Sequence, residues 1–365
     1  MAWTKTKFCT GFERNCPWSS GIPGEYFYWY GDPSSSNDVV MGVTNEDAHT
    51  GNYSLKISGT TSDDWLSARW LMNWRSKVAI GFWYKPSLIY GSDDETCVFS
   101  IMADDSTWPV RIYWDEAGTF YGMHNVMGVM GSLGGFPPGE WVHVGILYYN
   151  NPSPWGRYGL WLNGKEVFSF SGETNTSTYR DLYYFYFGSY PHDVSRNQGT
   201  PVGAFYDNPY VMRGNYNEAD LVPPDSRFLD IAPDGDGYHT EWAPSVQSPP
   251  LASLYEAVNS VQSTDRPNIK AWENDLLVSF TMENIASVGL AIPTVITRGD
   301  ISAYPGNAEA YIGIRTGGVD QFSAVDEGAP SWAKYIYILD KDAQSNDWTE
   351  SSVNTMEIAF KGSQL

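Results

Sequence analysis

The sequence predicts an all-β protein, and three observations support this prediction. Short segments rich in aromatic and β-branched residues alternate with turns that contain Gly and Pro along most of the 365 residues. Residues 158–162 and similar segments alternate at the two-residue period of a strand. Helical spacing of apolar residues is best developed only at 251–262, which is the best helix candidate, with an extended segment as its alternative.

The stretch from 139 to 168 gives the clearest local pattern. Trp141, Val142 and Val144 open a strand, and the following Asn-Pro-Ser-Pro cannot continue a ladder, so it predicts a loop. Residues 158–162 form the next strand. Asn163-Gly164 then supplies the positive φ angles of a type I′ turn, and the chain returns as a third strand. The expected order is therefore strand, loop, strand, tight turn and strand.

This stretch resembles the core of concanavalin A-like (laminin-G-like) jelly rolls, where a G-x-W-x-H-V strand precedes a V-W-L-N-G-K-x-V hairpin. The segments Gly11-Phe12-Glu13 and 49–57 resemble the opening of jelly-roll carbohydrate-binding modules. Residues 203–212 resemble the closing strand of the same family. Asn208-Pro209 departs from that pattern, and because Pro209 lacks an N–H donor we expect an edge or a bulge there.

Other strands follow from the same signals. In the first part we expect strands at 78–84, 97–102, 110–114 and 182–188, with a hairpin over 118–131. In the second part we expect them at 269–281, 287–297, 309–315 and 334–339. The Asp-Gly-Asp-Gly run at 234–237 lacks the later acidic ligands of a calcium loop, so it predicts a plain turn.

A composition change divides the chain. Residues 1–220 hold 43 of the 57 aromatic residues, and 221–365 hold the other 14. The segment Leu-Val-Pro-Pro-Asp-Ser at 221–226 has the composition of a linker. We therefore expect a jelly-roll domain over 1–220 and a smaller β-sandwich domain over 221–365.

Charge and composition exclude several classes of function. The net charge is −21, which argues against nucleic-acid binding because that needs basic clusters. No run of about 18 apolar residues predicts a membrane span, and the N-terminus does not resemble a secretory signal peptide. Cys9, Cys16 and Cys97 are expected to be reduced, although a Cys9–Cys16 bridge stays open.

Familiar catalytic motifs are missing from the sequence. A laminarinase-type hydrolase on this fold needs Glu-x-Asp-x-x-Glu on one strand. The nearest string is Glu273-Asn274-Asp275, which lacks the last Glu and lies in the second domain. No nucleophile-elbow, zinc-protease or phosphate-loop pattern occurs. The five histidines are scattered and are interpreted as structural or exposed, so we expect no enzymatic activity.

Calcium is the one cofactor that the resemblance implies. In jelly-roll binding modules an N-terminal Glu and a closing-strand Asp meet, and backbone carbonyls complete the shell. Glu13 and Asp207 match these positions, and residues 45–49 would supply carbonyls. The alternative is a solvated Glu and a turn-forming Asp.

Aromatic residues could also form a sugar platform, because pyranose rings stack on Trp and Tyr faces. The candidates are Trp108 before a proline, Trp155 in the Pro-rich loop, and Tyr190 and His192 after the 182–188 strand. The alternative for such residues is core packing or a subunit contact.

The order of segments in the second part resembles tailed-bacteriophage virion proteins that carry an N-terminal laminin-G-like domain. This resemblance implies a non-enzymatic virion structural protein, either a capsid decoration or a tail-associated adsorption protein, that assembles in the host cytoplasm and sits on the virion surface. Its expected partners are other virion proteins, a cell-surface glycan and further copies of itself. A stand-alone carbohydrate-binding module or lectin, which would be extracellular, is the second hypothesis, and a glycan hydrolase is the third.

Overall fold

The computed structural model describes residues 5–9, 27–30, 40–50, 54–58, 67–74, 77–90, 95–103, 107–125, 127–151, 155–174, 182–188, 200–213, 233–241, 243–244, 269–270, 276–285, 295–301, 308–323, 326–327, 333–339 and 341–364. The chain divides into two compact units. The first unit comprises Met1–Ser20 and Glu25–Leu229, and the second comprises Gly21–Gly24 and Asp230–Leu365. In the described residues of both units the regular secondary structure is nearly all strand, so the predicted all-β class is confirmed.

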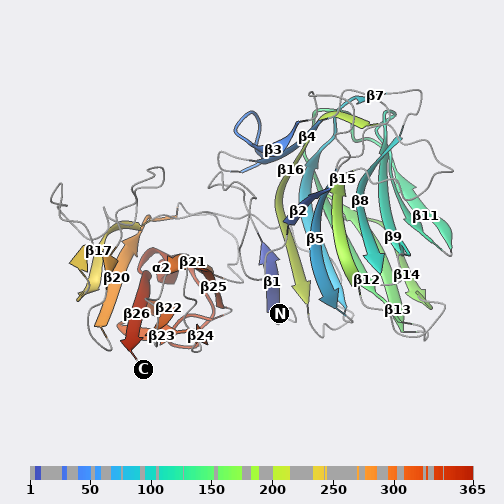
Figure 1. The fold of residues 1–365 in the computed structure, drawn as a ribbon. Helices are drawn as coiled ribbons and strands as arrows, with labels where there is room; N and C mark the ends of the chain where they lie inside the picture. Colours follow the sequence, from blue (N-terminus) through green and yellow to red (C-terminus); the bar gives the residue numbers. More distant parts are fainter. Residues whose placement is uncertain are drawn as a thin grey trace. The chain divides into compact units, whose positions relative to one another are not determined.

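The first unit is a sandwich of two antiparallel sheets (Figure 1). The nine-stranded sheet contains, in spatial order, β14 (Lys165–Gly172), β13 (Gly156–Leu162), β12 (Val142–Tyr149), β6 (Val78–Lys85), β16 (Thr200–Arg213), β4 (Ser54–Ser58) and β3 (Val40–Thr44), while β1 (Lys5–Cys9) and β7 (Ile89–Tyr90) also pair with β16. The seven-stranded sheet contains β11 (Gly128–Leu133), β10 (Phe120–His124), β9 (Val110–Asp115), β8 (Glu95–Ala103), β15 (Leu182–Gly188), β5 (Ser67–Trp74) and β2 (Phe27–Tyr30).

Alternate residues of both sheets point inward and form one core. In the nine-stranded sheet β6 contributes Ile80 and Phe82, and in the seven-stranded sheet β15 contributes Phe185 and Phe187. All four side chains are buried. The near-complete lack of a polar face in 182–188 is therefore explained by position, because β15 is a central strand flanked by β8 and β5.

Buried tyrosine hydroxyls tie the two sheets together across this core. Tyr206 on β16 donates to the carbonyl of Val98 at 2.9 Å, where β8 shifts register against β9. Tyr158 on β13 donates to the carbonyls of Arg111 and Met123, both at 3.4 Å. Burial raises the pKa of both phenols well above 10, so each stays a protonated donor.

The pattern predicted for 139–168 is confirmed strand by strand. β12, β13 and β14 form a meander, with Gly145 opposite Trp161 and Leu162 opposite Lys165. Asn163 and Gly164 have φ angles of 48° and 75°, the left-handed conformation that a type I′ turn requires. Asn163 also accepts the N–H of His143 through its side-chain oxygen at 2.8 Å, which fixes the turn against the preceding strand.

The sequence predicted an edge or a bulge at Asn208-Pro209, and the structure has the bulge. β16 lies inside its sheet, with β6 on one side and both β4 and β1 on the other. The register against β6 shifts between Asp207 and Tyr210, and Asn208 has a φ angle of 48°. Because of this shift, the ladder needs no N–H donor at position 209, so a proline is tolerated inside the sheet.

The second unit centres on one antiparallel sheet of six strands. It contains β17 (Pro233–Thr240), β20 (Leu276–Met282), β26 (Glu357–Gln364), β22 (Ala308–Thr316), β23 (Val319–Phe322) and β24 (Asp326–Glu327). Two further pairs are β18 (Ala243–Pro244) with β19 (Ile269–Lys270), and β21 (Val295–Ile301) with β25 (Ala333–Leu339). Phe280, Ile314, Trp348 and Ile358 pack in its core.

The short helix α2 (Glu350–Asn354) precedes β26 and was not predicted. Thr349 caps the helix by accepting the N–H of Ser352 at 3.0 Å, and Val353 is the buried residue of the helix. A helix this short carries no readable periodicity in the sequence. The helix candidate at 251–262 lies outside the described residues. Among the residues that are described, no helix has the length and apolar character to cross a bilayer.

The prediction of a plain turn at Asp234–Gly237 is wrong. These residues belong to β17, which pairs with β20 along Pro233–Met282, Asp236–Phe280 and Thr240–Val278. Gly and Asp are poor strand formers, yet pairing with a neighbouring strand outweighs such local preferences.

His124 is buried at the end of β10, on the core side of the seven-stranded sheet. Its Nε2 donates to the carbonyl of Thr174 at 3.2 Å, since a carbonyl can only accept. Tyr148 donates to the same carbonyl at 3.1 Å. Burial lowers the pKa of His124 from 6.5 to about 4.

We therefore predict that acid destabilises the first unit through His124. Between pH 6.5 and about 4, His124 is protonated in the unfolded chain but stays neutral in the folded chain. The free energy of unfolding therefore decreases as the pH falls through this range, by at most about 3 kcal/mol. His124→Gln keeps an N–H donor for Thr174 but does not titrate. Urea denaturation from pH 7 to pH 4 should show a flatter pH dependence for this variant. Parallel curves for both proteins would contradict the assignment.

Candidate functional site

The outward side of the seven-stranded sheet carries an unusual set of large side chains. Residues 97, 100 and 102 of β8 and residues 111 and 113 of β9 alternate with core residues and therefore point away from the core. We call the following group the aromatic face: Trp108, Tyr113, Tyr121, Tyr184 and Tyr186, with the charged residues Glu95 and Arg111. A sheet face exposed to solvent would normally be polar. Here Tyr113 and Tyr186 are almost fully buried, while Trp108, Tyr184 and Glu95 are half-buried.

Tyr113 and Tyr121 form the centre of the aromatic face. They are cross-strand partners whose rings stack with centroids 5.1 Å apart and planes at 15°. Together with Cys97 they make a small buried cluster that is separate from the main core. The hydroxyl of Tyr121 donates to a carboxylate oxygen of Glu95.

Two charged residues lie next to this cluster. Arg111 is only 7% exposed, and Glu95 is half-buried. Burial raises the pKa of the Cys97 thiol to about 12, while the nearby Arg111 lowers it and Glu95 raises it further. Arg111 lies two residues before Tyr113 on β9, and Glu95 lies two residues before Cys97 on β8, so a guanidinium and a carboxylate flank the tyrosine stack. Cys97 itself stays a protonated, unreactive thiol.

Trp108 and Tyr184 lie toward the other side of the aromatic face and are half-buried. Both pack on Tyr186, with ring centroids 5.0 Å away for Trp108 and 5.9 Å away for Tyr184. Tyr186 is opposite Ser100 across the ladder, and Ser100 is opposite Arg111. One cross-strand row therefore links this aromatic group with the charged group.

The four predicted sugar-binding residues fall in different places. Trp108 belongs to the aromatic face, where it is packed on Tyr186. Trp155 lies just before β13 of the nine-stranded sheet and is 69% exposed, so it is not part of the aromatic face. Tyr190 and His192 lie outside the described residues.

Asp207, the predicted calcium ligand, is fully buried in the β16 bulge. Its Oδ2 accepts the N–H groups of His49 and Thr50 at 2.9 and 3.0 Å, and its Oδ1 accepts the N–H of Asn208 at 2.7 Å. The carboxylate therefore anchors the 49–50 segment to the closing strand. Glu13 lies outside the described residues, and among those described no three His, Cys, Asp or Glu side chains gather to hold a metal. The Glu13–Asp207 calcium site stays a prediction.

Two histidines that are far apart in the sequence meet on the outward side of the nine-stranded sheet. His49 stacks on Trp83 with centroids 3.5 Å apart, and His143 packs on the same ring at 5.4 Å. Sequence reasoning treated the histidines as scattered. The signal that could have joined His143 to Trp83 is cross-strand register, since these two residues are direct partners on β12 and β6.

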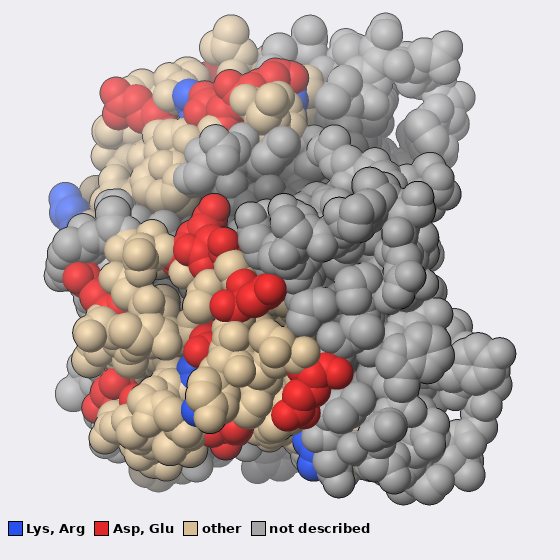
Figure 2. Space-filling view, turned by 90° about the vertical axis from the view of Figure 1, so that its left-hand side faces the viewer, with Lys and Arg blue, Asp and Glu red and all other residues tan. Residues whose placement is uncertain are grey.

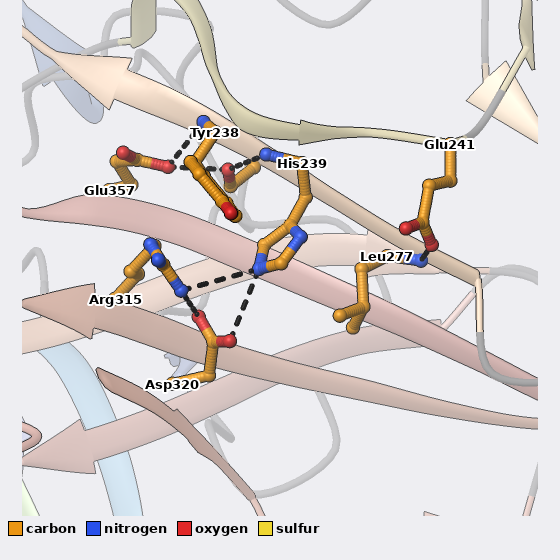
Figure 3. Close-up of polar contacts among 8 residues, drawn as sticks. Tyr238, His239, Glu241, Leu277, Arg315, Asp320 and Glu357 are labelled. Carbon is orange, nitrogen blue, oxygen red and sulfur yellow. Dashed lines mark hydrogen bonds and ion pairs between the residues drawn. The ribbon is translucent and has the colours of Figure 1, made fainter. Parts of the chain in front are cut away.

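A second polar group occupies the six-stranded sheet of the other unit (Figure 3). The row Glu357, Arg315 and Asp320 crosses β26, β22 and β23 in register. Arg315 Nη1 donates to Asp320 Oδ1 at 2.9 Å, and Nε2 of His239 lies 3.1 Å from Asp320 Oδ2. The guanidinium lies against the ring of Tyr238, 4.1 Å from its centroid.

No family model matches the chain. No curated protein matches its sequence either. Among solved structures the chain resembles an endo-β-1,4-glucuronan lyase from the fungus Trichoderma reesei, with 15% identity over 61% of this chain and 100% of that chain and a TM-score of 0.42. It also resembles the cellulose-induced protein Cip1, with 12% identity over 56% and 96% of the two chains and a TM-score of 0.39. A carbohydrate esterase from the Shiga toxin-encoding bacteriophage phi24B shows 12% identity over 58% and 99%, with a TM-score of 0.40.

These neighbours include a lyase and an esterase that act on carbohydrate. They contradict two predictions: that the protein is a non-enzymatic virion structural protein, and that it has no enzymatic activity. A likeness this distant concerns the fold, and one fold hosts many functions. The virion prediction rested on the order of short segments in the second part, which fixes no chemistry. In the structure Phe185 and Phe187 fill the core, and Tyr184 and Tyr186 belong to the aromatic face.

The calcium prediction can be tested on the intact protein. If an ion bridges Glu13 and Asp207 in the folded state alone, saturating calcium at about 100 times its Kd adds about 2.7 kcal/mol of stability. Chelation should then lower the melting temperature of the wild type and leave that of Asp207→Asn unchanged. Equal melting temperatures of the wild type with and without chelator would remove the site.

Proposed function

We propose that the protein binds a carbohydrate chain on the aromatic face of its first unit and acts on it there. The observation that carries this proposal is the aromatic face itself, where stacked tyrosines, a tryptophan, an arginine and a carboxylate share the outward side of one sheet. Tyr113, Tyr121 and Tyr186 are buried, so the part of this face that a ligand can reach is the half-buried set of Trp108, Tyr184 and Glu95.

Sugar rings are recognised by the combination that this face offers. Their C–H faces stack on aromatic rings, and their hydroxyl groups exchange hydrogen bonds with charged side chains. Trp108 and Tyr184 are half-buried and supply the ring surfaces. Glu95 is half-buried and supplies an acceptor beside the Tyr113–Tyr121 stack, and the buried Arg111 adds a positive charge next to it.

The pair formed by Tyr121 and Glu95 supports proton transfer during a reaction. A phenol that donates to a carboxylate is an acid–base pair within hydrogen-bond reach, and Arg111 could stabilise developing negative charge. Glycoside hydrolysis ordinarily uses two free carboxylates. Asp115, the cross-strand partner of Glu95, accepts the N–H of Thr119 at 2.8 Å and is engaged in a turn. This residue set therefore favours elimination over hydrolysis.

Activity is tested on a panel of neutral and uronic polysaccharides, with two readouts for each. New reducing ends report any chain cleavage, and ultraviolet absorbance of an unsaturated product reports elimination alone. Glu95→Gln and Tyr121→Phe should each lower kcat by roughly a hundredfold or more, the usual contribution of a positioned acid or base. Full activity of both variants would remove the catalytic assignment.

Binding is tested separately from activity. Trp108→Ala should weaken oligosaccharide binding roughly tenfold, because an aromatic stacking surface is lost. The matched control is Trp155→Ala, which removes an equally large ring that is 69% exposed and lies outside the aromatic face. Calorimetric titration of both variants decides between the two tryptophans. Loss of binding in Trp155→Ala with none in Trp108→Ala would move the site away from the aromatic face.

A further inference from the structure

The second unit displays one aromatic ring to solvent in an unusual way. Tyr238 is 70% exposed, although it lies on a strand of the six-stranded sheet. From Asp236 to Thr240 β17 advances four residues while β20 advances only two, from Phe280 to Val278. The surplus residues form a bulge that carries Tyr238 and His239 over the side chains of the sheet (Figure 3).

The backbone of this bulge is fixed by two side chains. The N–H of Tyr238 donates to Glu357 Oε2 at 2.8 Å, and the N–H of His239 donates to Ser279 Oγ at 2.9 Å. Ser279 in turn donates to the same Glu357 oxygen at 2.5 Å. Gly237 is required for this approach, because a Cβ there would lie 2.4 Å from Glu357 Oε2 and 2.8 Å from the backbone of Ser279.

The ring itself is also held in place. The guanidinium of Arg315 lies 4.1 Å from the ring centroid of Tyr238. Asp320 fixes that guanidinium through a hydrogen bond of 2.9 Å and also contacts His239. An exposed tyrosine would ordinarily sample several rotamers, whereas this one has its backbone and one ring face anchored. Such an arrangement reduces the entropy lost when a ligand stacks on the ring.

We propose that Tyr238 is the platform of a second saccharide-binding site, specific for neutral sugar rings. The exposed ring surface offers stacking to the C–H face of a pyranose, and the Glu357 carboxylate beside it can accept a sugar hydroxyl. Arg315 cannot serve as an anion site because its charge is paired with Asp320.

Charge supports the choice of a neutral ligand. The chain has 43 acidic and 22 basic residues. In the face that Figure 2 shows, Asp and Glu outnumber Lys and Arg among the described residues. Asp234, Asp236 and Glu241 are exposed on or next to β17, the strand that carries Tyr238. They would repel a polyanion, whereas an uncharged sugar would not be repelled. The proposal does not depend on the aromatic face, which belongs to the other unit.

The test uses the intact chain and four neutral probes: the hexasaccharides of cellulose, laminarin, xylan and mannan. Saturation-transfer NMR identifies the bound probe, and calorimetry measures its affinity. Tyr238→Ala should weaken binding of at least one probe roughly tenfold, whereas Tyr238→Phe, which keeps the ring, should bind within about twofold of wild type. Thr240→Ala, at an exposed position of the same strand, is the matched control.

Two further measurements make the outcomes distinct. The melting temperature of Tyr238→Ala should lie within a few degrees of that of wild type, since the ring is mostly exposed and loses only its contact with Arg315. Trp108→Ala should keep the Tyr238-dependent binding, so failure of the aromatic face and failure of this site give different results. The proposal would be overturned if wild type binds none of the four probes, or if Tyr238→Ala binds every probe with the affinity of wild type.

Discussion

The first unit depends on how its core satisfies carbonyl groups that the strand ladders leave available. Bulges shift the register of β8 and β10, and tyrosines from the opposite sheet donate to carbonyls at these places. Each such hydroxyl would be costly if buried alone, and so would an unpaired carbonyl. The pairing removes both costs at once, which explains why a core made of apolar side chains also holds fully buried tyrosines such as Tyr158 and Tyr206.

The aromatic face follows from the same strand geometry. Phe99 and Ile101 point into the core, so Ser100 between them points outward. The extra residue at Val98 keeps Cys97 on the outward side as well, next to Tyr113. Four strands, β8, β9, β10 and β15, contribute all of this face except Trp108, which lies just before β9. The positions of the other rings and charges are therefore set by the ladder, which is what a binding or catalytic site needs.

Local chemistry made part of this fold predictable. Asn163-Gly164 favours the positive φ angles of a tight turn, and Pro209 cannot donate a backbone hydrogen bond. The hairpin and the bulge could therefore be predicted from these residues alone. The candidate sites could not, because they depend on register between distant segments. Glu95 and Tyr121 are 26 residues apart, and His239 and Asp320 are 81 apart. The Gly-rich run at 234–237 was predicted wrongly because its pairing partner is distant in the sequence: Gly235 lies opposite Thr281 of β20, 46 residues later.

The pairing of β1 with β16 has a consequence for biosynthesis. Lys5 is the partner of Arg213, and among the described strands β1 pairs with β16 alone. This pairing cannot form until β16 leaves the ribosome. At about 5–20 residues per second, the N-terminal strand waits roughly ten to forty seconds after its own synthesis. During that interval the edge that β1 will cover does not yet exist. The unit therefore closes after translation of most of its length, and its nascent chain must remain soluble without its first strand in place.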